Sequence, residues 1–165
     1  MSILTYPASP FQSPLNQVSH ECFKNELEDK YFVDVMKEVT IIAKNDVGAL
    51  AAVAEALGGV GVNIEAISAY GRDNEAIFRL ITNDPQTVLK TMAKVSKVKV
   101  VSADVIVLKL INRPGELGKV TRKLANQGIN LESLYIVSRK HDFTEVAVKP
   151  ESKHFEKAKE VLGVK

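Results

Sequence analysis

The spacing of apolar residues predicts strands and amphipathic helices in a regular order along the first half of the chain. Residues 39–43 form an apolar run typical of a strand, and residues 48–57 place Leu50, Val53 and Leu57 on one face of a helix. The further expected elements are a strand at 62–67, a turn at 70–74, a strand at 76–82, a helix that begins at Asp84-Pro85 and a strand at 98–101. The predicted order is βαββαβ.

The apolar pattern of the second half predicts the same order of strands and helices, except that the last strand is missing. The expected elements are a strand at 105–111, a helix at 116–126, a strand at 129–137, a turn at 139–142, a strand at 143–149 and a helix at 151–162. Two helices on one face of a four-stranded antiparallel sheet form the ferredoxin-like arrangement. We therefore expect an α+β protein with two tandem ferredoxin-like βαββαβ modules, residues 37–103 and residues 104–165.

Residues 1–36 are expected to be an N-terminal extension. Residues 1–20 combine prolines with polar residues and predict a poorly ordered or wrapping segment, residues 21–30 resemble a short helix, and residues 31–36 alternate as a strand does. In this topology the fourth strand lies beside the first, so residues 105–111 would have an open edge, which natural sheets rarely leave bare. We predict that residues 31–36 pair with this edge, in the same chain or in a partner.

An internal repeat supports the division into two copies. At an offset of 67, residues 45–67 and 112–134 share eight identities. These are Asn45/Asn112, Gly48/Gly115, Leu50/Leu117, Val53/Val120, Leu57/Leu124, Gly61/Gly128, Asn63/Asn130 and Glu65/Glu132. A repeat of this length is typical of a small domain used twice rather than of a solenoid.

The repeated strand-to-helix corner is the candidate binding site. Asn45 offers an amide at the end of a strand, and Gly48, Ala49 and Leu50 present backbone N–H groups at the start of a helix, where a carboxylate can bind. Asn63, with its equivalent Asn130, can accept a hydrogen bond from an ammonium, so the set suits an α-amino acid. The alternative, in which these residues only form turns and caps, stays open.

These motifs resemble the ACT domain, a small amino-acid-binding regulatory module. The pattern N-x-x-G-x-L, followed some ten residues later by G-[VI]-N-[IL]-E, occurs in both copies, and the resemblance covers about residues 37–165. It implies modules that pair side by side so that their sheets join, with an amino acid at the interface and one copy's corner facing the other copy's second strand. The ligand contacts that it implies are Asn45, Gly48, Ala49, Leu50, Asn63, Ile64, Asn112, Gly115, Glu116, Leu117, Asn130 and Leu131.

The second copy departs from the first beside this site. Asp46 is replaced by Arg113 and Ala49 by Glu116, which adds charge to the second pocket. The two sites are therefore expected to differ in ligand, or one of them to be empty.

Composition narrows the function further. The 165 residues are 45% hydrophobic and 25% charged, with a net charge of +2, which is typical of a globular protein and too small to imply binding to nucleic acid or a membrane. The single Cys22 excludes an internal disulfide and a multi-cysteine metal site. No secretory signal or membrane-spanning run is present, so a cytoplasmic location is the default expectation.

Catalysis and RNA recognition find little support in the sequence. His20, His141 and His154 are scattered, and no catalytic, dinucleotide or phosphate-loop motif occurs. RNA recognition on this fold needs stacking aromatic residues on the central strands, and residues 39–43 and 77–81 contain only one. We therefore expect a non-catalytic protein without cofactor or metal.

If the protein is regulatory, it could act in one of two ways. The first is an amino-acid sensor that forms a homodimer or higher oligomer and controls a target enzyme. The second is a regulatory subunit that acts mainly through protein contact, because the first motif is also similar to that of the acetohydroxyacid synthase small subunit. Ile42, Val105 and Val107 make the face without helices more apolar than a solvated face needs, so pairing within the chain, the extension or a partner must cover it.

Overall fold

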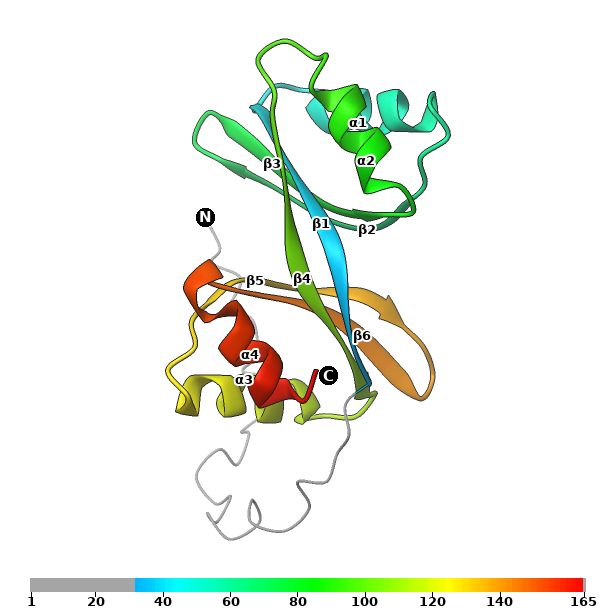
Figure 1. The fold of residues 1–165 in the computed structure, drawn as a ribbon. Helices are drawn as coiled ribbons and strands as arrows, with labels where there is room; N and C mark the ends of the chain where they lie inside the picture. Colours follow the sequence, from blue (N-terminus) through cyan, green and yellow to red (C-terminus); the bar gives the residue numbers. More distant parts are fainter. Residues whose placement is uncertain (1–31, 165) are drawn as a thin grey trace, which may run out of the picture. The chain divides into compact units, whose positions relative to one another are not determined.

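The computed structural model describes residues 32–164, shown in Figure 1. The elements are β1 (Phe32–Lys44), α1 (Ala49–Gly58), β2 (Ile64–Arg72), β3 (Glu75–Thr82), α2 (Pro85–Met92), β4 (Lys99–Ile111), α3 (Glu116–Asn126), β5 (Leu131–Arg139), β6 (Phe143–Pro150), the 3-10 turn η2 (Ser152–His154) and α4 (Phe155–Leu162). The chain is thus α+β, with one complete βαββαβ unit followed by αββα. The segment expected over residues 1–20 and the helix expected over residues 21–30 lie outside the described residues.

All six strands belong to one antiparallel sheet, in the order β2-β3-β1-β4-β6-β5. Its centre is the pair of 13-residue strands β1 and β4, which run side by side in Figure 1. Their ladder extends from Phe32 opposite Lys109 to Ile42 opposite Lys99. Because β1 also pairs with β3 and β4 with β6, these two strands connect the β2–β3 hairpin to the β5–β6 hairpin.

The pairing predicted for residues 31–36 is confirmed in the same chain. Val33 lies opposite Leu108 and Val35 opposite Ile106, so β1 covers the edge of β4 that would otherwise be open. The separation into short strands at 39–43, 98–101 and 105–111 is wrong, because β1 and β4 continue without interruption. The residues between the expected strands join the same ladder, with Lys37 opposite Asp104. The boundaries expected after residues 36 and 103 therefore fall inside strands.

One further boundary differs from the prediction for a local reason, and another agrees with it. The turn expected at residues 70–74 is shorter, because β2 continues to Arg72 and pairs there with Glu75. Asp73 takes a positive φ of 53°, a conformation that a short polar side chain tolerates better than most. The start of α2 is as predicted, since Asp84 accepts a hydrogen bond from the Thr87 N–H at 3.0 Å and Pro85 occupies the first turn.

The helices bury two separate cores against one face of the sheet. Alternate strand residues point to opposite faces, and the odd-numbered residues of β1 and the even-numbered residues of β4 supply the helix side. The first core includes Val39, Ile41, Val53, Leu57, Phe78, Leu80, Val88 and Met92. The second includes Ile106, Leu108, Val120, Leu124, Val146, Val148, Ala158 and Leu162.

The opposite face of the sheet is covered by the chain itself. A third cluster contains Ala66, Ile81, Val105, Val107 and Ala147, and β2 contacts β5 although the two are the edge strands of the sheet. The apolar face expected around Val105 and Val107 is therefore covered by pairing within the chain, and both residues are buried.

A fully buried carboxylate connects the strands on this second face. Glu38, in the middle of β1, accepts hydrogen bonds from the Arg79 guanidinium on β3 and the Lys149 ammonium on β6, each at 3.1 Å. The Tyr135 hydroxyl on β5 donates to the same carboxylate at 2.9 Å. Burial, together with the negative charge of Glu38, raises the pKa of Tyr135, so this hydroxyl stays protonated and able to donate. We call these four residues the Glu38 cluster.

We expect Glu38→Gln to lower the free energy of unfolding by about 3–5 kcal/mol. It leaves the largely buried Arg79 without its counter-charge, and Lys149 keeps only the more distant Glu132 carboxylate, at 3.8 Å. Urea denaturation followed by circular dichroism measures this change. Asp104→Asn is the matched control, since it breaks the exposed ion pair between Lys37, the neighbour of Glu38 on β1, and Asp104 on β4. It is expected to change the free energy by no more than about 1 kcal/mol. Equal, small losses in both variants would show that the Glu38 cluster does not hold the fold together.

Candidate functional site

The two strand-to-helix corners have the same backbone geometry. Gly48 and Gly115 precede α1 and α3 with φ of 87° and 93°, the left-handed region that favours glycine. Their carbonyls accept the first helical hydrogen bonds, from the N–H groups of Ala52 and Lys119. The repeat seen in the sequence is therefore a repeat of structure, with each glycine where the chain turns from strand to helix.

Each corner places a helix N-terminus at the surface. The first N–H groups of a helix have no partner within the helix and favour an anion. At the first corner the Ala49 N–H already donates to the Asp46 carbonyl at 3.1 Å, so a ligand would depend on the N–H groups that follow. The side chains of Leu50 and Leu117 are each 41% exposed at matching positions. The backbone of the first corner can thus bind a small carboxylate, but the Ala49 N–H, one of the expected donors, is already used within the chain.

The asparagines before the corners bind their own hairpins. The Asn45 side-chain amide donates to the Asp73 carbonyl at 3.5 Å, and that of Asn112 donates to the Lys140 carbonyl at 3.0 Å. In addition, the Asn45 N–H donates to the Asn74 carbonyl at 2.9 Å. Both side-chain amides therefore have the structural role that the sequence analysis kept as the alternative, because they bind each corner to the turn of the neighbouring hairpin.

The second-strand asparagines also have partners within the chain. The Asn130 amide donates to the Glu151 carboxylate at 2.7 Å. The Asn63 N–H donates to the side-chain oxygen of Asn83 at 2.8 Å. These contacts hold the start of each second strand to the segment that follows the third. A ligand ammonium is itself a donor, so it would bind the side-chain oxygens of these asparagines and not the groups that donate here.

The corners do not lie opposite the second strands of the other half. Ile64 and Leu131 begin β2 and β5 and are half-buried. Within the chain β2 contacts β5, whereas α1 packs against α2 and α3 against α4. A site that joins a corner to the other copy's second strand would therefore have to form between two chains.

The two corners differ in charge at Glu116. Its side chain is buried and accepts hydrogen bonds from Arg113 at 2.5 Å and Lys119 at 3.1 Å. Burial raises the pKa of Glu116, but the hydrogen bonds from these two cations outweigh it and hold the pKa below its ordinary value. The second corner thus contains a carboxylate of its own at the start of α3, whereas the first turn of α1 contains no acidic residue.

A comparison with protein-family models gives a match in the second half of the chain. Residues 105–163 match the ACT domain family model. The match includes the Gly115 corner and ends before the last residues of the chain, and it does not include the first half. Comparison with curated proteins gives no match.

Solved structures share the arrangement of elements. The crystal structure of protein BT0572 from Bacteroides thetaiotaomicron is 27% identical, with a TM-score of 0.70, and covers 79% of this chain and 88% of that one. The regulatory subunit of aspartate kinase from Thermus thermophilus is 16% identical, with a TM-score of 0.56 and coverage of 79% and 94%. The corresponding subunit from Thermus flavus is 15% identical, with a TM-score of 0.56 and coverage of 81% and 95%. At these identities, the two aspartate kinase subunits show only that this chain has a similar fold.

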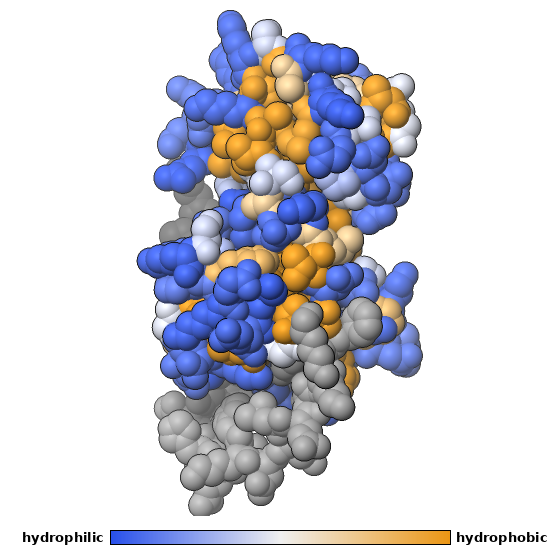
Figure 2. All heavy atoms as spheres, in the orientation of Figure 1, coloured by the Kyte–Doolittle hydropathy of each residue, from blue (hydrophilic) through white to orange (hydrophobic). Residues whose placement is uncertain are grey.

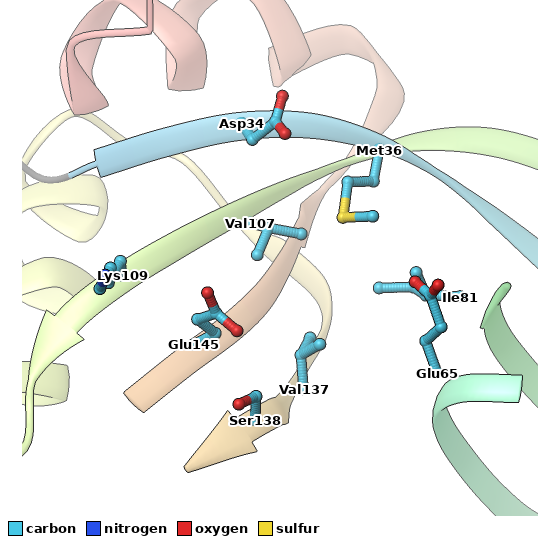
Figure 3. Close-up of a pocket in the computed structure, with 9 residues that line it drawn as sticks. All are labelled: Asp34, Met36, Glu65, Ile81, Val107, Lys109, Val137, Ser138 and Glu145. Atoms are coloured by element: carbon cyan, nitrogen blue, oxygen red, sulfur yellow. The ribbon is translucent and has the colours of Figure 1, made fainter. Parts of the chain in front are cut away.

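A cavity of about 310 Å³ lies away from both corners, on the face of the sheet without helices (Figure 3). Its lining comes from all six strands: Asp34, Met36, Glu65, Ile81, Val107, Lys109, Val137, Ser138 and Glu145. It contains none of the residues expected from the ACT resemblance. No motif marks it in the sequence, because the lining residues are far apart in the chain and meet only when the sheet folds over.

The surface offers little else that marks a site. Apolar side chains reach it in several places in Figure 2, and Val47, directly before the Gly48 turn, is fully exposed. Within residues 32–164 no group of three or more His, Cys, Asp or Glu side chains is arranged to hold a metal ion. Among the described helices none is long and apolar enough to cross a membrane.

Two glycines of the second corner should respond in opposite ways to alanine. Gly115→Ala is expected to lower the free energy of unfolding by about 1–2 kcal/mol, because its φ of 93° disfavours a side chain although the space beside it is open. Gly118→Ala, inside the same helix and also in open space, is expected to raise the free energy by about 0.5–1 kcal/mol. Urea unfolding measures both changes. A loss in both variants would point to crowding instead of backbone conformation.

Glu116→Gln should destabilise the protein only where the native carboxylate is ionised. A lowered folded-state pKa contributes stability above the unfolded-state pKa, and this contribution is lost as the pH falls through the folded-state value. We expect a deficit of about 1–3 kcal/mol at neutral pH. It begins to shrink near the ordinary pKa of a glutamate, about 4.3, and disappears below the lowered folded-state pKa. Urea unfolding of both proteins from about pH 7 to about pH 3 tests this. A deficit that persists unchanged in acid would contradict it.

Proposed function

We propose that the protein is a non-catalytic regulatory protein that senses an amino acid through two tandem ACT modules. These are the repeats of residues 37–103 and residues 104–165, with the strands β1 and β4 common to both. The observation that carries this proposal is the ACT match over residues 105–163, together with the same corner geometry at Gly48 in the half that the match leaves out. The two modules share strands, since β1 and β4 pair with each other and each belongs to the sheet of both halves.

The ligand carboxylate binds at the backbone of a corner, where the helix N-terminus favours an anion. The first corner is the better candidate, because Glu116 already places an ion-paired carboxylate beside the second. The full residue set of the site is the one implied by the ACT resemblance, Asn45, Gly48, Ala49, Leu50, Asn63 and Ile64 with their equivalents Asn112, Gly115, Glu116, Leu117, Asn130 and Leu131.

A second copy of the chain completes the site. The corner and the opposing second strand do not meet within the described chain, whereas β2 and β5 are the edges of the sheet and can approach a partner. We therefore propose a homodimer or higher oligomer in which the amino acid sits between chains. A ligand that binds only the paired arrangement stabilises it by its difference in affinity, and a coupling of about 1–3 kcal/mol is enough to control a target enzyme on another chain.

A second candidate function is regulation through protein contact with little or no ligand. The side-chain amides of Asn45, Asn112 and Asn130 all donate to the chain itself, which fixes their orientation for a structural role. The Asn112 oxygen also accepts from the Thr144 hydroxyl at 3.3 Å, which leaves it less available to a ligand ammonium. Val47 and Leu50 also expose apolar surface at the first corner, as a docking partner would require. A regulatory subunit similar to that of acetohydroxyacid synthase would act in this way on a separate catalytic chain.

A thermal-shift screen against the twenty amino acids separates the two functions. A specific ligand present at about 100 times its dissociation constant adds about 2.7 kcal/mol, which raises the melting temperature by roughly 10 °C. Gly48→Val and Gly115→Val are expected to remove or weaken binding in calorimetric titration because they distort the corner, and Gly118→Ala is the control that leaves it intact. If none of the twenty gives a shift, the contact role is the correct one.

A further inference from the structure

The cavity on the face without helices has an apolar floor. Ile81 and Val107 are buried in the third cluster, and Met36 and Val137 pack against that cluster. Figure 3 shows Val107 and Val137 pointing into the same space as the Glu145 side chain. The volume of about 310 Å³ is at the small end of the range for small-molecule pockets, and an apolar floor with a few polar groups is their usual composition.

The walls of the cavity carry more negative than positive charge. Three carboxylates line it, from Asp34, Glu65 and Glu145, against one ammonium, from Lys109, which gives 1 − 3 = −2 in a chain whose net charge is +2. The Lys109 ammonium lies over the Phe143 ring, 3.6 Å from its centroid. A cavity that is locally acidic within a basic chain selects for a positive charge.

These carboxylates are not neutralised by the surrounding protein. Among residues 32–164, Glu65 and Glu145 have no lysine, arginine or histidine nitrogen within ion-pair distance, and Asp34 accepts only the N–H of its neighbour Val35, at 2.8 Å. The contrast is with Glu38 on the same face, whose carboxylate is bound by two cations. Asp34 and Glu65 are exposed to solvent and Glu145 is half-buried, so an ammonium that enters the cavity meets carboxylates that no cation of the described chain occupies.

We propose that this cavity binds a small aliphatic amine, with its hydrocarbon chain on the floor and its ammonium groups against the carboxylates. The four apolar side chains distinguish the site from one for a bare metal ion, which needs oxygen or nitrogen ligands on several sides. The excess of negative charge distinguishes it from a site for a carboxylic acid. The cavity shares no residue with either corner, so this proposal does not depend on the proposed function.

A ligand in the cavity would also bear on the arrangement of the sheet. Glu65 and Ile81 come from β2 and β3, whereas Val137 and Glu145 come from β5 and β6. The two pairs belong to opposite ends of the strand order and meet only because the sheet folds over. A bound amine therefore stabilises that folded-over arrangement in proportion to its occupancy.

The methionines provide a direct probe of occupancy. Met36 lines the cavity, whereas Met92 is buried in the first core, away from it. In protein labelled with ¹³C at the methionine methyl groups, titration with 1,5-diaminopentane is expected to move the Met36 resonance to saturation and to leave the Met92 resonance in place. Met36→Leu assigns the signal. Pentan-1-ol should bind about tenfold more weakly, and the dianion glutarate should not bind.

Charge-neutral variants test which groups bind the amine. The double variant Glu65→Gln, Glu145→Gln is expected to weaken the binding of 1,5-diaminopentane by roughly tenfold, since each lost ion pair at a partly exposed site is worth up to about fivefold. Glu55→Gln, on the exposed side of α1, is the matched control and should bind as the native chain does.

Three results would overturn the proposal: no saturable shift of Met36, equal affinity for the amine and the alcohol, or full affinity in the double variant. Gly48→Val separates this site from the corner, because it should bind the amine normally even when amino-acid binding is lost. Conversely, a protein that binds no amino acid but shifts Met36 with the amine would refute the proposed corner site and leave the cavity site standing.

Discussion

The ladder between β1 and β4 is the constraint on which the rest of the structure depends. Each strand has 13 residues, about twice the usual length. Each also pairs on its other side with a hairpin strand, β3 or β6. Without the N-terminal part of β1, the strand that begins the second half would present unpaired backbone groups to solvent. The helices and hairpins of both halves are thus attached to one central pair of strands.

The Glu38 cluster adds specificity to this ladder. Backbone pairing alone tolerates slips in register, whereas a buried carboxylate must meet its cations or remain uncompensated. Glu38 lies in β1, and its partners Arg79, Tyr135 and Lys149 come from strands on both sides of the central pair. A shift of β1 against its neighbours would move Glu38 away from these cations, so the contacts favour the observed register and the folded-over sheet.

Sequence reasoning recovered what local physics determines. The strand-to-helix corners at Gly48 and Gly115, the cap at Asp84 and the pairing of residues 32–36 all follow from turn chemistry, helix capping and the need to cover an edge. It did not recover the continuity of β1, because Lys37 and Glu38 resemble a polar break between two strands, and their pairing becomes clear only when the partner strand is known.

The candidate site was harder to predict than the fold. The asparagine positions were identified correctly as repeated, but repetition does not distinguish a ligand contact from a hairpin contact, and Asn112 has the second role in the structure. The cavity left no trace in any motif. Asp34 and Glu145, for example, are 111 positions apart and line the same space because β4 lies between their strands.

Because β1 and β4 belong to both halves of the sheet, the chain cannot be divided at the boundary of the sequence repeat. A cut between residues 103 and 104, where the sequence repeat would place it, passes through the middle of β4. Trimming the chain to residue 37 would likewise remove the first part of β1, which pairs with residues 105–109. Neither fragment would keep the sheet of its own half whole, so the two halves, although they share a sequence repeat, fold as one unit.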